Sequence, residues 1–190
     1  RIISDIDNLS VLSALEQTEG RGQRGNKWTS KAGENLMFSI VLKSPALMAE
    51  DHFALNEIAA LSVSEFLSTY GIKAQIKWPN DIYVDEKKIC GILIENSFRG
   101  KSISSSIIGI GLNINQRNFN VTQVSPTSVA IETGKEEDID RCLVEFMDVF
   151  RSYVGRYLHI NGGLRNLRKL YLSQMWRKDS MHRYIDVAAG

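Results

Sequence analysis

A glycine-rich segment, Gly20 to Trp28, holds the residues of this chain that are best suited to bind an anion. It reads GRGQRGNKW, so Gly20, Gly22 and Gly25 have the spacing G-x-G-x-x-G. Glycines let backbone N–H groups approach a phosphate closely. Arginine adds charge-assisted, bidentate hydrogen bonds, and tryptophan offers a flat face for a base. The segment therefore predicts a loop that binds a phosphate or a nucleotide.

Three interpretations of this loop compete. A dinucleotide-binding loop needs a strand before it and a helix opening inside it. Residues 11–17 predict the strand, but residues 29–34 read as a turn and residues 36–42 as a buried strand, so the helix is missing. A protein-kinase loop would need His-Arg-Asp, Asp-Phe-Gly and Val-Ala-Ile-Lys motifs, which the chain lacks. A solvated basic loop remains the third interpretation.

Three further segments could line the same pocket. They are Lys77-Trp78-Pro79-Asn80-Asp81, the run from Lys88 to Glu95, and Gly109-Ile110-Gly111-Leu112-Asn113-Ile114-Asn115. Each segment could also have a purely structural role. The first could be a turn, the second could carry a solvated lysine at a hairpin edge, and the third could be a bulge in a strand. The functional interpretation is that all of them contribute to one backbone-rich site.

The elements that must position these residues follow from hydrophobic periodicity. Helical spacing is found over residues 47–70, 138–158 and 164–176, and Gly71 is a stop signal for the first helix. Short apolar or alternating runs predict strands over residues 74–78, 82–84, 89–96 and 102–112, with a hairpin tip at residues 99–101. We therefore expect an α+β fold, with a mixed, mostly antiparallel sheet and helices packed on one face.

Composition excludes several classes of function. A chain of 190 residues suits one domain, and a net charge of +1 provides no global field to recruit nucleic acid or an anionic membrane. Cys90 and Cys142 form no C-x-x-C pair, so we expect neither a zinc site nor a disulfide scaffold. Because so few cysteines are typical of a reducing compartment, we expect a cytoplasmic location. We find no signal peptide and no apolar run long enough to cross a bilayer.

Taken together, four blocks resemble the biotin protein ligases, also called biotin–acetyl-CoA-carboxylase ligases. The blocks are Gln17 with residues 20–28, residues 77–81, Lys88 with Gly91, and residues 109–113 with Pro126-Thr127-Ser128. They occur in the family's order and spacing. The resemblance implies a catalytic domain over residues 1–176, with the ligase fold related to class II aminoacyl-tRNA synthetases. It also implies that biotin and Mg-ATP form biotinyl-5′-AMP, and that biotin then passes to a lysine of a biotin carboxyl carrier domain.

The resemblance also implies a role for each site residue. Lys88 is the principal cation, Arg21 the second, and Asp81 holds and deprotonates the incoming lysine. Trp28 packs either on the adenylate or in the core beneath the loop. The implied biotin-binding residues are Gln17, Gly20, Arg21, Gly22, Gln23, Lys88 and Gly91, and the implied nucleotide-binding residues are Arg24, Trp28, Asn80 and Asn113. No protein ligand for a metal is expected beyond the Mg²⁺ that accompanies ATP.

The sequence departs from the family in three places. The N-terminal Asp-Ser-Thr-Asn is absent, because Asp5-Ile6-Asp7 runs directly into Asn8-Leu9-Ser10, and we expect missing residues near positions 7–10. Gln23 stands where many relatives have arginine. Residues 177–190 read as the first strand of a small β-barrel-like domain. We expect no helix-turn-helix before Arg1 and therefore predict no DNA binding, whereas a homodimer is possible.

Two alternative functions stay open at this point. One is a lipoate or octanoate ligase or transferase of related fold. The other is a non-catalytic biotin sensor, whose turnover is lost with the N-terminal segment.

Overall fold

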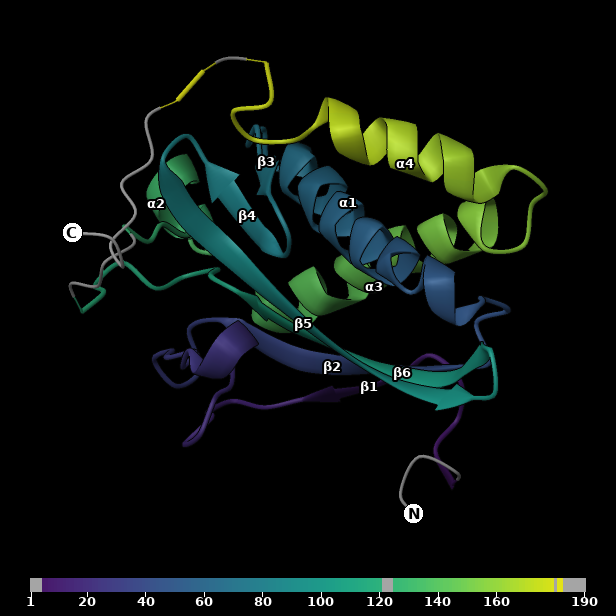
Figure 1. Ribbon diagram of the computed structural model, residues 1–190. Coiled ribbons are helices and arrows are strands. Elements are labelled where there is room, and N and C mark those ends of the chain that lie inside the picture. The colour runs from purple at the N-terminus through teal and green to yellow at the C-terminus, as the bar shows by residue number, and fades with distance from the viewer. Residues whose placement is uncertain (1–4, 121–124, 180, 183–190) are drawn as a thin grey trace, which may run out of the picture.

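The computed structural model describes residues 5–120, 125–179 and 181–182. Its centre is a six-stranded sheet in the order β1-β2-β6-β5-β4-β3 (Figure 1). Every pair of neighbouring strands is antiparallel. The strands are β1 (Ser10–Ser13), β2 (Leu36–Lys43), β3 (Gln75–Lys77), β4 (Asp81–Val84), β5 (Lys87–Arg99) and β6 (Ser102–Leu112). Parallel pairing occurs at isolated bridges, Ile76 with Met175 and Lys88 with Pro126.

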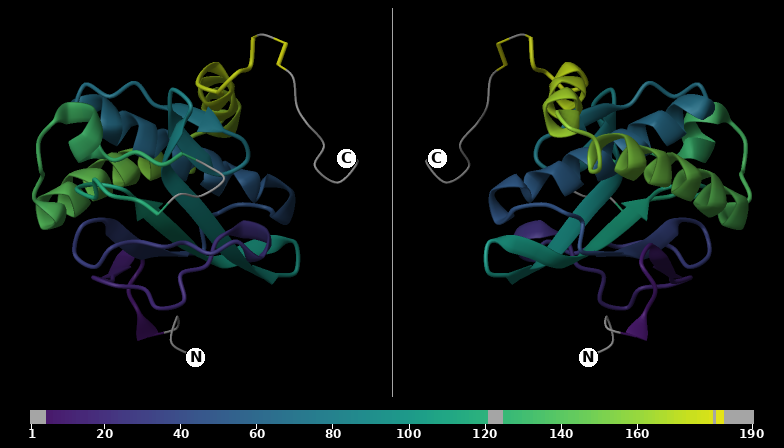
Figure 2. Two further views of the ribbon diagram at one scale, coloured as in Figure 1. Left: turned by 90° about the vertical axis from the view of Figure 1, so that its left-hand side faces the viewer. Right: turned by 90° about the vertical axis from the view of Figure 1, so that its right-hand side faces the viewer.

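The longer helices cover one face of this sheet (Figures 1 and 2), as the sequence predicted. The helices are α1 (Phe53–Thr69), α2 (Val129–Thr133), α3 (Ile139–Tyr157) and α4 (Gly163–Ser173). Helix α1 is buried on nearly every side, because it lies between the sheet, α3 and α4. Phe146 of α3 packs edge-on against Phe38 of β2, with ring centroids 5.2 Å apart. Phe53 and Tyr171 make the equivalent contact between α1 and α4 at 5.7 Å.

Local sequence signals set the start of α3 and the end of α1, whereas a tertiary contact sets the start of α1. The Asp138 carboxylate caps α3 by accepting from the Arg141 amide at 3.0 Å. Gly71 ends α1 with a φ of +74°. The predicted start at Leu47 was wrong, because the Ile103 amide donates to the Leu47 carbonyl at 3.0 Å and ties that residue to β6. A 3₁₀ turn at Ala49–Asp51 follows, and α1 begins only at Phe53.

The two faces of the sheet carry different side chains. Side chains alternate between faces along a strand, so the even-numbered residues of β6 and β5, such as Ile108, Ile110 and Ile92, enter the helical core. The odd-numbered positions Gly91, Gly109 and Gly111 therefore lie on the face opposite the helices. Figure 2 shows the sheet between the helices and the segment that leads from β1 through η2 (Gln23–Gly25) into β2.

Both ends of the chain differ from expectation. The strand predicted over residues 11–17 ends at Ser13, beyond which the chain leaves the sheet, so Gln17 lies in a loop. At the other end α4 stops at Ser173, and residues 174–176 return to the edge of the sheet. There the Ile76 amide donates to the Gln174 carbonyl, and the Trp176 amide to the Ile76 carbonyl, both at 2.9 Å. Residues 177–179 form a turn rather than a strand, and most of the remaining predicted strand lies outside the described residues.

Candidate active site

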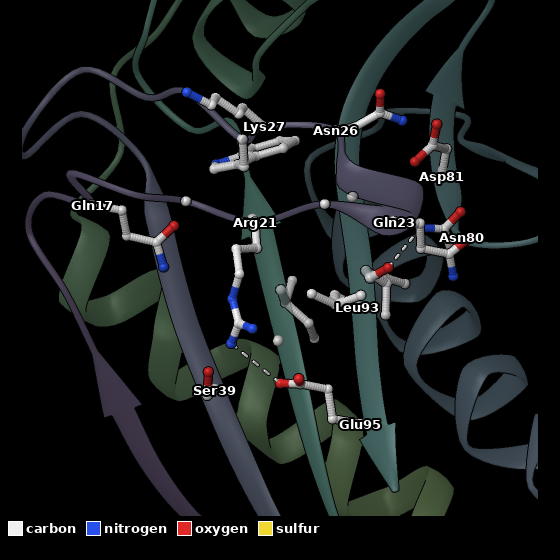
Figure 3. Close-up of a pocket in the computed structure, with 18 of the residues that line it drawn as sticks. Gln17, Arg21, Gln23, Asn26, Lys27, Ser39, Asn80, Asp81, Leu93 and Glu95 are labelled. Carbon is white, nitrogen blue, oxygen red and sulfur yellow. Dashed lines mark hydrogen bonds and ion pairs between the residues drawn. The ribbon is translucent and has the colours of Figure 1, made fainter.

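A cavity of about 750 Å³ lies on the face of the sheet that the helices leave open (Figure 3). Its walls come from residues 16–23 and 26–28, from residues 78–81, and from β2, β5 and β6. The volume is in the range of small-molecule sites. The predicted site residues that line it are Gln17, Gly20, Arg21, Gly22, Gln23, Trp28, Asn80, Asp81, Lys88 and Gly91.

The glycine-rich segment is a small hairpin closed by backbone hydrogen bonds. The Trp28 amide donates to the Gly20 carbonyl at 2.9 Å, and the Gly22 amide donates to the Asn26 carbonyl at 2.7 Å. A Cβ on Gly20 would lie 2.4 Å from the Trp28 carbonyl oxygen, so only glycine closes the hairpin here. Gly25 at the tip has a φ of +80°, which glycine adopts without strain.

The indole of Trp28 forms a floor beneath this hairpin. It rests on Gly91 and Gly111, which pair directly across β5 and β6. A Cβ on Gly111 would lie 2.4 Å from the indole Cε2, and a Cβ on Gly91 would lie 3.2 Å from Cζ3. The indole Nε1 is buried and has no hydrogen-bond partner among the described residues. The bare backbone of this glycine pair therefore accommodates Trp28.

Lys88 and Asp81 form an ion pair in the same pocket, with Nζ 2.6 Å from Oδ1. Asp81 begins β4 and pairs in register with Gly91. Both backbone groups of Lys88 are hydrogen-bonded to one segment, since its amide donates to the Ser125 carbonyl at 2.8 Å and its carbonyl accepts from the Thr127 amide at 2.9 Å. Its ammonium lies 5.7 Å from the Trp28 ring centroid. A cation and a carboxylate are therefore placed together on the wall of the pocket.

Cys90, next to Lys88 in sequence, is not a candidate nucleophile. Its side chain is fully buried in the helical core. Burial raises the pKa of this thiol well above its ordinary value, and the nearby Lys88 charge offsets only part of that effect. The thiolate needed for nucleophilic attack is therefore suppressed.

The opposite end of the pocket carries Gln17, Arg21, Ser39 and Glu95 (Figure 3). The Arg21 guanidinium lies 3.7 Å from the Glu95 carboxylate, and both side chains are largely exposed. Ser39 was absent from the predicted segments, and Leu93 and Glu95 lay within the predicted run from Lys88 to Glu95 but were not named as site residues. Strand parity was the signal that could have found them, because Leu93 and Glu95 share the face of Gly91 and Ser39 pairs with Gly109.

The remaining predicted residues are placed differently. Asn113 does not line the pocket, and its buried amide donates to the Thr127 carbonyl at 2.9 Å, beside the segment that pairs with Lys88. Asn80 lines the pocket, but its side-chain amide donates to the Ile92 carbonyl at 2.7 Å. The Arg24 side chain lies outside the described part of the structure.

The described part of the chain offers neither a cluster of metal ligands nor a membrane-spanning helix. No group of three or more His, Cys, Asp and Glu side chains there is placed to hold a metal ion. No helix there is long and apolar enough to cross a membrane.

Comparison with known proteins shows the family to which the chain belongs. Residues 2–113 match the model of the biotin/lipoate A/B protein ligase family. The chain belongs to that family. Within it, the chain is similar to the biotin–[acetyl-CoA-carboxylase] ligase of Paracoccus denitrificans, with 33% identity over 153 residues that cover 76% of this chain and 60% of that protein. It is also 34% identical over 134 residues to the bifunctional ligase/repressor BirA of Bacillus subtilis, covering 70% of this chain and 41% of BirA.

A solved member of the family has the same fold. The biotin protein ligase from Aquifex aeolicus, in complex with biotin and ATP, superposes with a TM-score of 0.78 at 31% identity, covering 90% of this chain and 70% of that one. The expected ligase fold is thus confirmed. The chain spans about 41–60% of the length of the two curated relatives named above.

Proposed function

We propose that this protein activates biotin with Mg-ATP to biotinyl-5′-AMP and then transfers biotin to a lysine of a biotin carboxyl carrier domain. The observation that carries the proposal is the Lys88–Asp81 ion pair, at 2.6 Å, in a pocket walled by the hairpin of residues 20–28. Relatives named as biotin ligases, and the family member solved with biotin and ATP, support it.

The first step brings negative charges together. The biotin carboxylate attacks the α-phosphorus of ATP, a P–O bond forms, and pyrophosphate leaves with the electrons of the broken bond. Fixed cations lower the energy of this transition state because they lie where charge develops. Lys88 is assigned to bridge the carboxylate and the α-phosphate. Arg21 is the second cation, and it must exchange Glu95 for the ligand.

The hairpin then protects the product. Biotinyl-5′-AMP is a mixed anhydride that water would hydrolyse. Of the two backbone amides predicted as donors, that of Gln23 is assigned to the adenylate, because the Gly22 amide already donates to the Asn26 carbonyl within the hairpin. A hairpin folded over the ligand excludes water and strengthens each electrostatic contact beneath it.

The second step needs a base, and Asp81 is assigned to it. The ε-amine of the carrier lysine attacks the biotinyl carbonyl, an amide bond forms and AMP leaves. Once the phosphate engages Lys88, the Asp81 carboxylate loses its present partner and becomes available to hold the incoming ammonium and take its proton. Trp78, whose exposed fraction is 60%, also lines the pocket.

Pyrophosphate release is the test. With biotin and Mg-ATP we expect release that depends on biotin, followed by labelling of a carrier domain. Release with lipoate or octanoate and not with biotin would favour the alternative that the family name includes. Tight binding of biotin without any release would favour a non-catalytic sensor.

Cellular context and assembly stay predictions. We propose a cytoplasmic location, which is supported by two free, buried cysteines, Cys90 and Cys142. The Bacillus relative is named a ligase/repressor, but its match covers 41% of that protein, and the absence of DNA binding here stays a prediction. The possible homodimer, the missing residues near positions 7–10 and the domain boundary after residue 176 are likewise predictions.

A further inference from the structure

The backbone carbonyl of Pro79 is a point where the helical layer reaches the pocket. The side-chain amide of Asn56, on α1, donates to this oxygen. The hydroxyl of Tyr171, on α4, lies 3.4 Å from the same oxygen. Pro79 itself lines the pocket two residues before Asp81. Two helices therefore place hydrogen-bond donors on one carbonyl beside the candidate site.

Both donors are polar groups within an apolar core. Asn56 is 7% exposed and Tyr171 is 1% exposed. Burial, with the nearby Glu57 carboxylate, raises the pKa of Tyr171 to about 12, so its hydroxyl keeps the proton that it donates. The Phe53–Tyr171 ring contact and the Arg168–Glu57 ion pair fix α4 against α1. Buried polar groups are retained where they have partners, and here the shared partner is Pro79.

The sheet holds the other side of the same segment. The Ile92 amide donates to the Asn80 carbonyl at 2.9 Å, and the Asn80 side chain donates to the Ile92 carbonyl at 2.7 Å. Asp81 follows directly, with its carboxylate on Lys88. The segment from Trp78 to Asp81 is thus held by α1 and α4 at Pro79 and by β5 beyond it. Neither Asn56 nor Tyr171 lines the pocket.

We infer that Asn56 and Tyr171 are positioning residues that act on the reaction through Pro79. By fixing that carbonyl they keep the Asp81 carboxylate in reach of Lys88 and of the incoming amine. This inference rests on the proposed function. A misplacement of about 1 Å at a reacting group costs on the order of a hundredfold in rate, and the contacts with β5 that remain would limit the loss to roughly tenfold.

The test compares Asn56→Leu/Tyr171→Phe with Tyr153→Phe. The control removes another buried hydroxyl, which lies on α3, bonds to Glu65 at 2.7 Å and does not line the pocket. In the double variant we expect kcat for transfer to fall roughly tenfold, with KM for biotin unchanged. We also expect faster amide hydrogen exchange over residues 78–81 without ligands. Tyr153→Phe should lower Tm without either change.

Several outcomes would overturn the inference. One is a wild-type kcat in the double variant, and another is an equal loss of kcat in Tyr153→Phe. If the double variant does not fold, Tyr171→Phe alone is measured against the same criteria. A wild-type protein that releases no pyrophosphate would defeat the proposed function instead. Amide hydrogen exchange over residues 78–81 in the double variant would then decide whether Asn56 and Tyr171 hold the segment. An exchange rate equal to that of the wild type would show that they do not.

Discussion

Lys88 and Asp81 are each about one quarter exposed, at 25% and 22% of the side chain, so neither is fully hydrated and neither is sealed in the core. Partial burial strengthens their mutual attraction relative to a surface pair. It also means that removing one partner leaves the other with an unpaired charge in a partly desolvated site. Their ion pair is therefore sensitive to substitution.

Lys88→Ala should retain the fold and lose the adenylation step. Loss of one fixed cation where charge develops should slow pyrophosphate release by about a hundred- to a thousandfold. Stopped-flow release at saturating biotin and ATP measures this, with circular dichroism as the check on folding. Lys87→Ala is the matched control, because its side chain is exposed on the same strand and does not line the pocket. Wild-type release by Lys88→Ala would remove Lys88 from the mechanism.

Gly111→Ala should displace the Trp28 indole from the pocket floor. The added methyl would lie 2.4 Å from Cε2, so the ring must move. Overpacking of this kind costs about 1–3 kcal/mol. We expect a shift in tryptophan emission and weaker binding of biotin and ATP, measured by fluorescence and calorimetry. Gly155→Ala is the control, because nothing lies within 4 Å of its added Cβ. Unchanged emission and affinity in Gly111→Ala would contradict the proposed floor.

At the scale of elements, the sequence predicted those helices and strands whose bounds depend on local hydrophobic patterns. Alternation over β6 and the apolar stripe of α3 both gave elements close to those observed. Helix α2 was missed because its five residues are too short to display a helical period. The start of α1 was misplaced because a contact between Leu47 and β6 overrides helical spacing.

The candidate site was predictable where its residues are contiguous in sequence. Residues 20–23, 26–28 and 78–81 line the pocket, and they were found because their two blocks each carry their own chemistry. The packing of Trp28 on two glycines was not predicted, because it depends on the strand register that places Gly91 opposite Gly111. Pairing between strands is a long-range property, and no window of sequence around either glycine contains it.

The hairpin of residues 20–28 should become resistant to protease when both substrates are bound. Its arginines and lysine repel one another until an anion arrives, and its glycines cost entropy to order. Limited trypsin digestion followed by mass spectrometry should show slower cleavage after Arg21 and Lys27 with biotin and ATP together. The exposed turn at residues 99–101, between β5 and β6, serves as the internal control. Equal slowing at both places, or at neither, would count against closure of the hairpin.

At the scale of the whole molecule, the sheet separates a stabilising layer from a ligand-binding layer. The helical layer nevertheless contains a buried carboxylate, Glu57 of α1, paired with Arg168 of α4. Burial raises the pKa of Glu57, and the attraction of Arg168 offsets only part of that effect. The folded state therefore disfavours the charged form of this side chain.

This sign predicts the pH dependence of a substitution. Because the folded pKa is raised, the stability that Glu57 contributes is present below the unfolded pKa and is lost as pH rises through the folded pKa. The Glu57→Gln variant cannot ionise at this position and so avoids that loss. Its free energy of unfolding, relative to that of the wild type, should therefore increase as pH rises. Urea unfolding from about pH 4 to about pH 8 measures this, with exposed Glu136→Gln as the control. A difference independent of pH would contradict the raised pKa.

The central claim is that this pocket joins biotin to AMP. The most direct measurement is mass spectrometry of the ligand retained by the wild-type protein after incubation with biotin and Mg-ATP, in the absence of a carrier domain. We predict that biotinyl-5′-AMP is recovered with the protein and that Lys88→Ala, after the same short incubation, retains far less of it. Recovery of unreacted biotin and ATP alone, from wild-type protein that binds both, would contradict the account.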